Sequence, residues 1–278
     1  MPELPEVETM RRGLAPIVGG VITAVQKPRC TAKPISIKPG WPQIRRKLVG
    51  TRVARIDRRG KRLIVVNDGE LRLVIEPRMT GLVALAEVPS QEHLRLRLLV
   101  EGAKASQMLF WDRRGLGTVR LLTPDEFETQ LGPEHLGPDA LECSLTEFRK
   151  RLASSRRAVK VALLDQKAIA GIGNLYASEM LYLARIGPML ECRELETPDW
   201  RRLHAAMQKV LRTAILYEGS TLNDGTYRNT LNKAGEYQNH HRVYDRAGES
   251  CASCQNHRIV RIVQAQRSTF YCPGCQPC

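Results

Sequence analysis

Residues 251–275, CASCQNHRIVRIVQAQRSTFYCPGC, decide the fold of the C-terminal part of the chain. Two Cys-x2-Cys pairs, Cys251 with Cys254 and Cys272 with Cys275, are separated by 17 residues. This spacing is typical of a structural zinc site in which four thiolates hold the metal on a β-ribbon. Because four protein ligands leave no open coordination position, we expect one zinc ion that stabilises the fold and takes no part in chemistry. The basic and apolar residues between the pairs predict a hairpin with Arg267 near its tip.

Upstream of the ribbon, the apolar residues follow a helical period. Ser144-Leu-Thr-Glu147 is a capping-box pattern that opens one helix, and Thr197-Pro198 opens another. The second helix has an apolar stripe of Leu203, Met207, Val210, Leu211 and Ile215. Between the two helices lies Ala170-Gly-Ile-Gly-Asn-Leu-Tyr176, whose glycines would let backbone N–H groups meet an anion. By itself this motif is equally typical of a tight turn between helices.

The N-terminal half has a different pattern. Residues 4–18 predict a helix that ends at Gly19-Gly20, and short strands follow from about residue 20 to 123. Leu94-Arg-Leu-Arg-Leu98 alternates strictly, with one apolar and one basic face. Such spacing predicts an antiparallel sandwich or barrel with a basic outer face. The stretch Leu131-Gly-Pro-Glu-His-Leu-Gly-Pro138 then predicts an interdomain linker.

Composition indicates the kind of partner and the compartment. The 43 Lys and Arg residues exceed the 29 Asp and Glu residues by 14, and this excess favours a polyanionic partner. The sequence has neither an apolar run of membrane-spanning length nor a basic-then-apolar signal layout, so we expect a cytoplasmic, reducing environment. Three isolated cysteines, Cys30, Cys143 and Cys192, are predicted to be small buried hydrophobes. Cys278 is predicted to be a free tail residue rather than a zinc ligand.

The first residues, Met-Pro-Glu-Leu-Pro-Glu-Val-Glu, carry a candidate nucleophile. Removal of Met1 would leave Pro2 with a secondary amine, flanked by Glu3 and Glu6. Such an amine attacks a sugar aldehyde and forms a Schiff base, and a neighbouring carboxylate moves the protons. Taken locally, the same residues also suit a helix start, because proline fits the first helical position and acidic residues favour the helix N-terminus.

With the terminus, the glycine turn and the ribbon together, the chain resembles the bacterial formamidopyrimidine-DNA glycosylase family over nearly its whole length. The matching stretches are Met1-Pro-Glu-Leu-Pro-Glu-Val-Glu-Thr9, Asp165-Gln-Lys-Ala-Ile-Ala-Gly-Ile-Gly-Asn-Leu-Tyr-Ala177, Val243-Tyr-Asp-Arg-Ala-Gly248 and Gln266-Arg-Ser-Thr-Phe-Tyr-Cys-Pro-Gly-Cys-Gln276. The resemblance implies a multidomain α+β fold. Its expected parts are an N-terminal helix with a two-layer antiparallel β-sandwich (1–131), a linker (132–143), a helix–two-turns–helix domain (144–228), and the end of a capping loop with the zinc ribbon (229–278).

The resemblance also implies the reaction. Pro2 would attack C1′ of the damaged nucleotide and displace the base, with Glu3 as the acid/base for sugar opening and Glu6 in support. Strand cleavage by β- and then δ-elimination would follow. Lys61 matches the family lysine assigned to β-elimination and phosphate contact, and Arg267 matches the ribbon-tip arginine that grips phosphate and is linked to δ-elimination.

Further positions match DNA contacts of the family. Asn174 matches its phosphate-binding asparagine, and His93 and Arg156 fall at contact positions. Without the family, Lys61 is one of several surface lysines on a basic strand, and His93 and Arg156 are solvated polar side chains.

The side chains that fill the gap left by an extruded base map to Met79, Arg114 and Leu116. Without the family, Met79 would be a core residue beside a turn. The family usually has Phe at Leu116, so lesion search or damage discrimination is expected to differ. Glu76 stands where many members have a phosphate-contacting His, and a carboxylate cannot donate to phosphate. Residues 219–236 correspond, in diverged form, to the loop that closes over an oxidised purine.

Three functions remain in view. The first is a base-excision-repair glycosylase and lyase that removes oxidised purines, 8-oxoguanine and formamidopyrimidines, from damaged double-stranded DNA. The second is an endonuclease VIII-like activity on oxidised pyrimidines, against which Leu4-Pro5 and the long loop argue. The third is a non-enzymatic zinc-ribbon DNA-binding protein, which has no need of Pro2, Glu3 and Lys61. We expect a bacterial cytoplasmic monomer without membrane contact, associated with the nucleoid through DNA.

Overall fold

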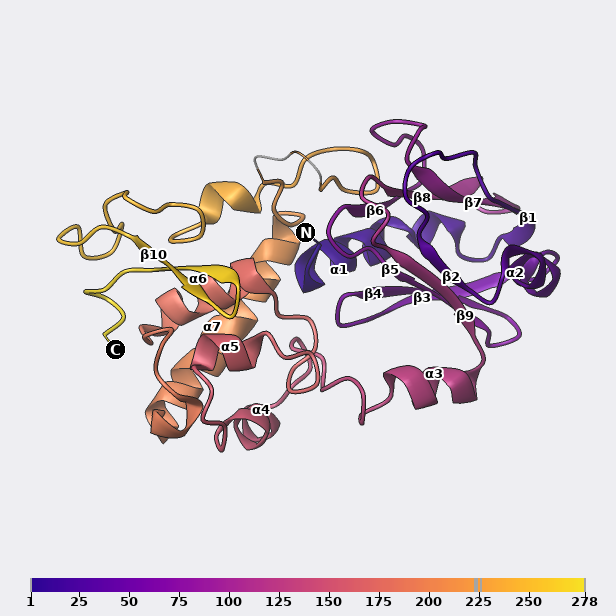
Figure 1. The fold of residues 1–278 in the computed structure, drawn as a ribbon. Helices are drawn as coiled ribbons and strands as arrows, with labels where there is room; N and C mark the ends of the chain where they lie inside the picture. Colours follow the sequence, from indigo (N-terminus) through magenta and orange to yellow (C-terminus); the bar gives the residue numbers. More distant parts are fainter. Residues whose placement is uncertain (1, 223–224, 226, 278) are drawn as a thin grey trace. The chain divides into compact units, whose positions relative to one another are not determined.

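The computed structural model describes residues 2–222, 225 and 227–277, which form two compact units (Figure 1). The first unit comprises the described residues of 1–132 and 215–238, and the second comprises those of 133–214 and 239–278. Within the described part of the chain, the helices are too short or too polar to cross a membrane.

The first helix is shorter than the sequence pattern predicts. Helix α1 spans Leu4–Gly13, and a 3-10 turn, Ala15–Ile17, follows it. The prediction of a helix to residue 18 was therefore wrong. Pro16 explains the early end, because proline has no N–H for the helical ladder and its ring clashes with the preceding turn. The chain then reverses at Gly19, whose φ of +87° suits glycine.

The first unit has two β-sheets, as the predicted sandwich requires. One sheet has the strand order β1-β7-β8-β6, and the other has the order β2-β9-β5-β4-β3. All neighbours are antiparallel except β2 and β9, which are parallel. The strands are β1 Val21–Gln26, β2 Ser36–Lys38, β3 Val53–Arg59, β4 Arg62–Asn67, β5 Arg72–Glu76, β6 Gly81–Ala84, β7 Leu94–Glu101, β8 Gln107–Asp112 and β9 Thr118–Leu122.

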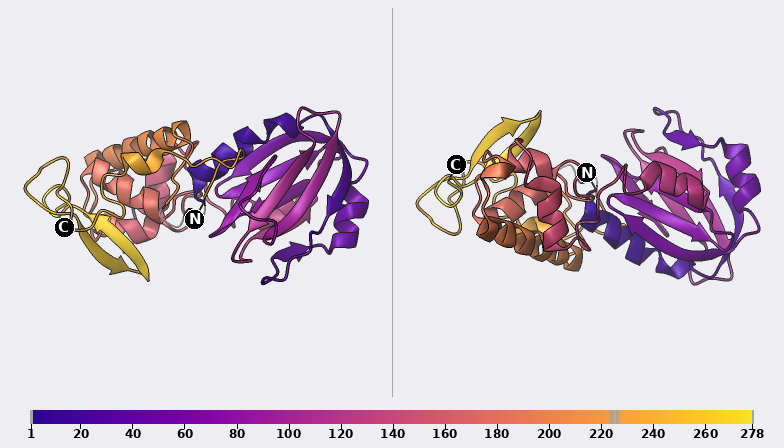
Figure 2. Two further views of the ribbon diagram at one scale, coloured as in Figure 1. Left: turned by 90° about the horizontal axis from the view of Figure 1, so that it is seen from above. Right: turned by 90° about the horizontal axis from the view of Figure 1, so that it is seen from below.

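An apolar core lies between the two sheets. Helix α1 contributes Val7 and Met10 to it, and helix α2 (Trp41–Leu48) contributes Ile44. Helix α3 (Pro124–Leu131) covers the other face of the five-stranded sheet, where Phe127 and Leu131 pack against side chains of β4, β5 and β9 (Figure 2). Burial of this apolar surface is the main force that joins the layers.

The outer face of β7 differs from its prediction. Arg95 is only 5% exposed, so the expected basic face is not open to solvent at this position. Its Nε donates to the carbonyl oxygen of Asp112 at 2.8 Å, and its Nη1 lies 2.8 Å from Cys30 Sγ. Cys30 is accordingly half-buried rather than buried, whereas Cys143 and Cys192 are buried as predicted. Alternation alone does not show that another segment covers a strand.

The second unit contains helices and a two-stranded ribbon. The helices are α4 Leu145–Leu152, α5 Val159–Leu163, α6 Asn174–Ala184 and the main part of α7 Thr197–Leu216, with a 3-10 turn at Cys192–Glu194. A further 3-10 turn, Tyr237–His240, begins in the residues of the first unit and ends in those of the second. The Ser144 hydroxyl caps α4 by accepting from the N–H of Glu147 at 3.2 Å. The predicted apolar stripe of α7 is buried. Strands β10 Val260–Gln264 and β11 Arg267–Tyr271 form the hairpin, with Arg267 first after its turn.

Candidate functional site

The start of α1 holds two buried carboxyl groups next to Pro2. Glu3 and Glu6 are 3% and 2% exposed, and Pro2 is buried as well. The backbone N–H of Glu3 donates to Glu6 Oε2 at 2.8 Å. Glu3 and Glu6 therefore do form the predicted helix start, as a capping box. The same hydrogen bond fixes the Glu6 carboxylate close to residue 2.

Glu6 also binds the segment that follows α7. Its Oε1 accepts from the backbone N–H of Ser220 at 2.9 Å. Gly219 has a φ of +82°, and a Cβ there would lie 2.8 Å from the same oxygen, so only glycine allows this approach. The predicted closing loop, 219–236, therefore begins against the helix that directly follows Pro2 and Glu3. Its residues 223, 224 and 226 lie outside the described residues.

A buried ion-pair network joins α1 to the β3–β4 turn. Arg58 donates from Nε to Glu8 Oε2 at 3.0 Å and from Nη1 to the carbonyl oxygen of Gly60 at 2.9 Å. Glu8 and Arg58 side chains are 8% and 6% exposed. Lys61 is the next residue of that turn. The network thus relates the position of Lys61 to the helix that follows Pro2, and sequence reasoning missed it because Glu8 and Arg58 are 50 residues apart.

Acid is expected to weaken the first unit through Glu8. Burial by itself raises the pKa of Glu8, but hydrogen bonds from Arg11, Arg12 and Arg58 lower it from 4.5 to about 2. The pKa is lower in the folded chain, so the stabilisation is complete above pH 4.5 and is lost as the pH falls to about 2. A shift of this size corresponds to roughly 3 kcal/mol of unfolding free energy.

Denaturant unfolding of Glu8→Gln and wild type across this pH range measures the effect. Wild type is expected to be more stable at neutral pH, and the two curves should converge near pH 2. Glu70→Gln is the matched control, because Glu70 pairs with Arg55 at an exposed site. Parallel pH curves for wild type and Glu8→Gln would contradict the assignment.

The buried side chain of Asp112 joins two turns. One turn holds Met79, and the other holds Arg114 and Leu116. Asp112 is 0% exposed, and its Oδ1 accepts from the Thr80 hydroxyl at 2.5 Å and from the Arg114 N–H at 3.2 Å. Its Oδ2 accepts from the Gly117 N–H at 2.7 Å. Met79 is 39% exposed, which disfavours the core alternative.

The Glu76 carboxylate is engaged by arginines of its own unit. It is 9% exposed and forms ion pairs with Arg62 and Arg78 at 3.4 and 3.2 Å. His93 is partly buried, packs edge-to-face against Trp111 and lies 3.1 Å from Glu92. His93 is thus less solvated than expected for the alternative, in which it is simply a solvated polar side chain.

In the second unit, a buried lysine joins the glycine turn to the ribbon. Lys160 is 1% exposed, and its Nζ lies 2.7 Å from Asn174 Oδ1 and 2.9 Å from Thr269 Oγ1. The Asn174 amide donates to the carbonyl oxygen of Ser268 at 2.9 Å. Asn174 and the residue after Arg267 are therefore in direct contact. Nothing in the sequence near Lys160 distinguishes it from the other lysines, whereas Arg156 lies exposed in the segment after α4.

The four ribbon cysteines form a cluster that fits zinc. Their sulfur atoms all lie within 4.8 Å of one another. Cys251 and Cys275 are 3.7 Å apart, as are Cys254 and Cys272. Tetrahedral zinc with Zn–S distances of about 2.3 Å places its sulfurs about 3.8 Å apart. The cluster confirms the predicted ligand geometry for one structural ion.

Helix α6 anchors this cluster from its side. The Tyr182 hydroxyl lies 3.2 Å from Cys251 Sγ and 2.6 Å from Ser253 Oγ. The fully buried Glu179 accepts from the backbone N–H groups of Val243 and Tyr244, both at 2.9 Å. The helix that begins at Asn174 thus also fixes the chain that enters the ribbon.

A helix and β-sandwich, a helical unit with a glycine turn, and a four-cysteine ribbon together define the class of helix–two-turns–helix zinc-finger proteins. Three family models match these parts in order. They are the formamidopyrimidine-DNA glycosylase N-terminal domain at residues 1–119, its H2TH domain at residues 131–226, and the zinc finger found in FPG and IleRS at residues 248–277. The chain belongs to the formamidopyrimidine-DNA glycosylase family.

Individual relatives match over the whole chain. The formamidopyrimidine-DNA glycosylase of Chloroflexus aurantiacus is 40% identical over 99% of this chain and 98% of its own. The crystal structure of MutM (FPG) from Thermus thermophilus is 36% identical, with a TM-score of 0.85 over 99% of this chain and 98% of that one. A Lactococcus lactis FPG mutant in complex with a Fapy-dG containing DNA is 33% identical, with a TM-score of 0.87 over the full length of both chains.

Proposed function

We propose that this protein is a base-excision-repair enzyme that removes oxidised purines from duplex DNA and cleaves the strand. The observation that carries the proposal is the pair of buried carboxyl groups next to Pro2, in a chain of the formamidopyrimidine-DNA glycosylase family. A relative of 33% identity has been crystallised with Fapy-dG DNA, which supports the oxidised-purine class. The net charge of +14 suits the phosphate backbone.

The proposed chemistry begins when the amine of Pro2 attacks C1′ of the damaged nucleotide. The C1′–N bond to the base breaks, and the base leaves with its bonding electrons and a proton. Glu3 protonates the sugar ring oxygen, the ring opens, and the nitrogen of Pro2 forms a Schiff base with C1′. Glu6 orients this end of the helix through its hydrogen bonds to the Glu3 and Ser220 N–H groups.

Strand cleavage follows from the Schiff base. The iminium makes the proton on C2′ acidic, and its removal expels the 3′ phosphate in β-elimination. A second elimination expels the 5′ phosphate. We assign Lys61 to the first elimination and Arg267 to the second, each also contacting phosphate, with Asn174, Arg156 and His93 as further DNA contacts. Cationic and amide donors suit phosphate oxygens.

Access to the base requires its extrusion from the duplex. The exposed Met79 and the half-buried Leu116 are assigned to the gap that the base leaves, and Arg114 to the orphaned cytosine. Asp112 holds both turns through Thr80 and the backbone, so these side chains start from fixed positions. Leu116 has no aromatic ring to stack on a neighbouring base.

The proposal includes a division of the chain into four parts at residues 131, 143 and 228. It also includes a cytoplasmic location in association with the nucleoid. A monomer is proposed as the active form. The chain offers one structural zinc site in its described residues, and the proposed steps use only protein side chains and the Pro2 amine.

Excision assays test the proposed function directly. Duplexes with 8-oxoguanine opposite cytosine should yield a nick with phosphate on both sides of a one-nucleotide gap, as β,δ-elimination requires. Duplexes with thymine glycol, an oxidised pyrimidine, should be cut at least about tenfold more slowly, which corresponds to about 1.4 kcal/mol of discrimination. Faster cleavage of thymine glycol would favour the endonuclease VIII-type alternative. Binding without a nick would favour a non-enzymatic zinc-ribbon protein.

A further inference from the structure

A cavity of about 400 Å³ lies in the second unit between α4 and the first turns of α7. Its apolar surface comes mainly from the half-buried Leu145 and Ala153, which lie over the buried Trp200. Three cationic side chains, Arg149, Lys150 and Arg201, also line it. No acidic residue is among the residues that line this cavity. The cavity therefore combines an apolar floor with a positively charged rim.

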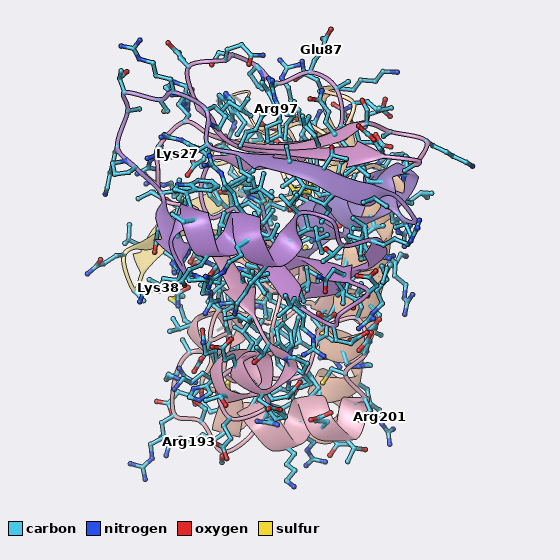
Figure 3. The ribbon with its side chains drawn as sticks, turned by 90° about the vertical axis from the view of Figure 1, so that its right-hand side faces the viewer. Lys27, Lys38, Glu87, Arg97, Arg193 and Arg201 are labelled. Atoms are coloured by element: carbon cyan, nitrogen blue, oxygen red, sulfur yellow. The ribbon has the colours of Figure 1, made fainter. Side chains whose placement is uncertain are left out.

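The three cations are available to an external partner. Arg149, Lys150 and Arg201 are exposed, and none forms an ion pair within the described part of the chain. Figure 3 shows Arg201 on the surface of the second unit. Unpaired cations around a concave apolar surface attract carboxylates more strongly than isolated surface charges do, because the low-dielectric wall focuses their field.

Helix geometry separates Glu147 of α4 from the cavity, and Asp199 in the first turn of α7 is paired with Arg202. Leu145, Arg149 and Ala153 are four residues apart and therefore share one face of α4. Glu147 and Arg151 occupy another face, where they pair at 3.7 Å. The positive end of the 20-residue helix α7 adds to the field at the cavity.

We propose that this cavity is a docking site for an acidic peptide segment of a partner protein. Carboxylates of the segment would contact Arg149, Lys150 and Arg201, and one apolar side chain would enter the cavity against Leu145 and Ala153. Its volume suits one or two side chains. The apolar floor offers nothing to a phosphodiester, so an acidic peptide fits better than a nucleic acid.

The cavity also lies apart from the two DNA contacts proposed at the ribbon, Asn174 and Arg267, whereas Arg156 follows three residues after Ala153 of its lining. Figure 1 shows α4 at the lower side of the second unit, whereas the β10–β11 ribbon lies at its upper side. Arg267 belongs to the ribbon, and Asn174 contacts Ser268 of the same ribbon. A segment bound at α4 would therefore leave the ribbon accessible, and the proposal does not depend on the reaction proposed above.

Fluorescence anisotropy with a labelled peptide tests the docking site. The probe is a run of aspartates that carries adjacent Leu and Phe residues. Charge reversal of the rim in the double variant Arg149→Glu/Arg201→Glu is expected to weaken binding to the full-length protein at least about tenfold, since each contact is worth up to about 1 kcal/mol. Arg151→Glu is the matched control on the other face of α4, and it should change binding less than about twofold.

A second probe, with Ser in place of Leu and Phe, examines the apolar floor. Its affinity should fall at least about tenfold, because burial of one such side chain is worth about 1.5–3 kcal/mol. Equal binding of both probes, or equal loss in Arg151→Glu, would reduce the effect to net surface charge and overturn the proposal. Loss of DNA affinity in the double variant as large as its loss of peptide affinity would show a nucleic-acid surface instead. Unchanged circular dichroism and 8-oxoguanine excision establish that the variants are folded.

Discussion

Borohydride is expected to trap the protein covalently on duplex DNA that holds 8-oxoguanine opposite cytosine, and acetylation of the Pro2 amine is expected to abolish the adduct. The hydride reduces the Schiff base between the Pro2 nitrogen and C1′ to a stable amine. An acetylated nitrogen is an amide, whose lone pair is delocalised and does not attack carbon. The same reasoning applies while Met1 remains attached, so the sample must be trimmed to Pro2. Denaturing gel electrophoresis measures the trapped fraction.

The variant Pro2→Gly distinguishes the contribution of the amine itself from the contribution of its position. Glycine keeps an α-amine, but it lacks the ring that fits the buried position ahead of α1. Loss of near-attack geometry by about 1 Å costs on the order of 10²-fold in rate, so trapping should slow by about that factor. Lys61→Gln is the companion variant, which should still be trapped because its amine is not the nucleophile. Trapping of the acetylated protein at the wild-type rate would eliminate Pro2 as the nucleophile.

Short-range patterns made much of this chain predictable. The cysteine spacing places four ligands by itself, and the structure brings their sulfurs within 4.8 Å. Positions 2, 3 and 6 are close in sequence, so one helix start necessarily brings them together. Arg267 follows the hairpin turn because Ala265 and Gln266 adopt left-handed φ values of +46° and +62°.

The supporting residues escaped prediction because their partners are distant in sequence. Asp112 joins residues 80 and 114, and Lys160 contacts Thr269 across 109 positions. Each is an ordinary polar residue in its own strand or helix, and only the folded chain shows that it is buried. The prediction that Arg95 is exposed was wrong for the same reason, because a neighbouring segment with Cys30 covers it. Local pattern thus identifies candidate groups, whereas tertiary contacts fix their geometry.

Removal of zinc is expected to abolish DNA binding while the first unit stays folded. A structural four-thiolate site supplies the ribbon with much of its folding free energy, about 10–16 kcal/mol in zinc-finger peptides. Without the ribbon, Lys160 loses Ser268 and Thr269 as hydrogen-bond acceptors, and Asn174 loses Ser268. The proposed phosphate contacts at Asn174 and Arg267 therefore fail together. Chelation, or the variant Cys254→Ser, should weaken binding to lesion DNA on the order of 10²-fold or more.

Anisotropy with lesion DNA measures this loss, and zinc content by atomic absorption shows whether the metal has left. Cys30→Ser is the matched control, because Cys30 lies in the first unit and outside the cluster. Near-wild-type affinity is expected for it, with one zinc retained. The first unit has its own core between two sheets, so its thermal unfolding should persist after chelation. Full DNA affinity in metal-free protein would mean that the ribbon is not the grip on DNA. Collapse of the first unit as well would mean that the two units do not fold independently.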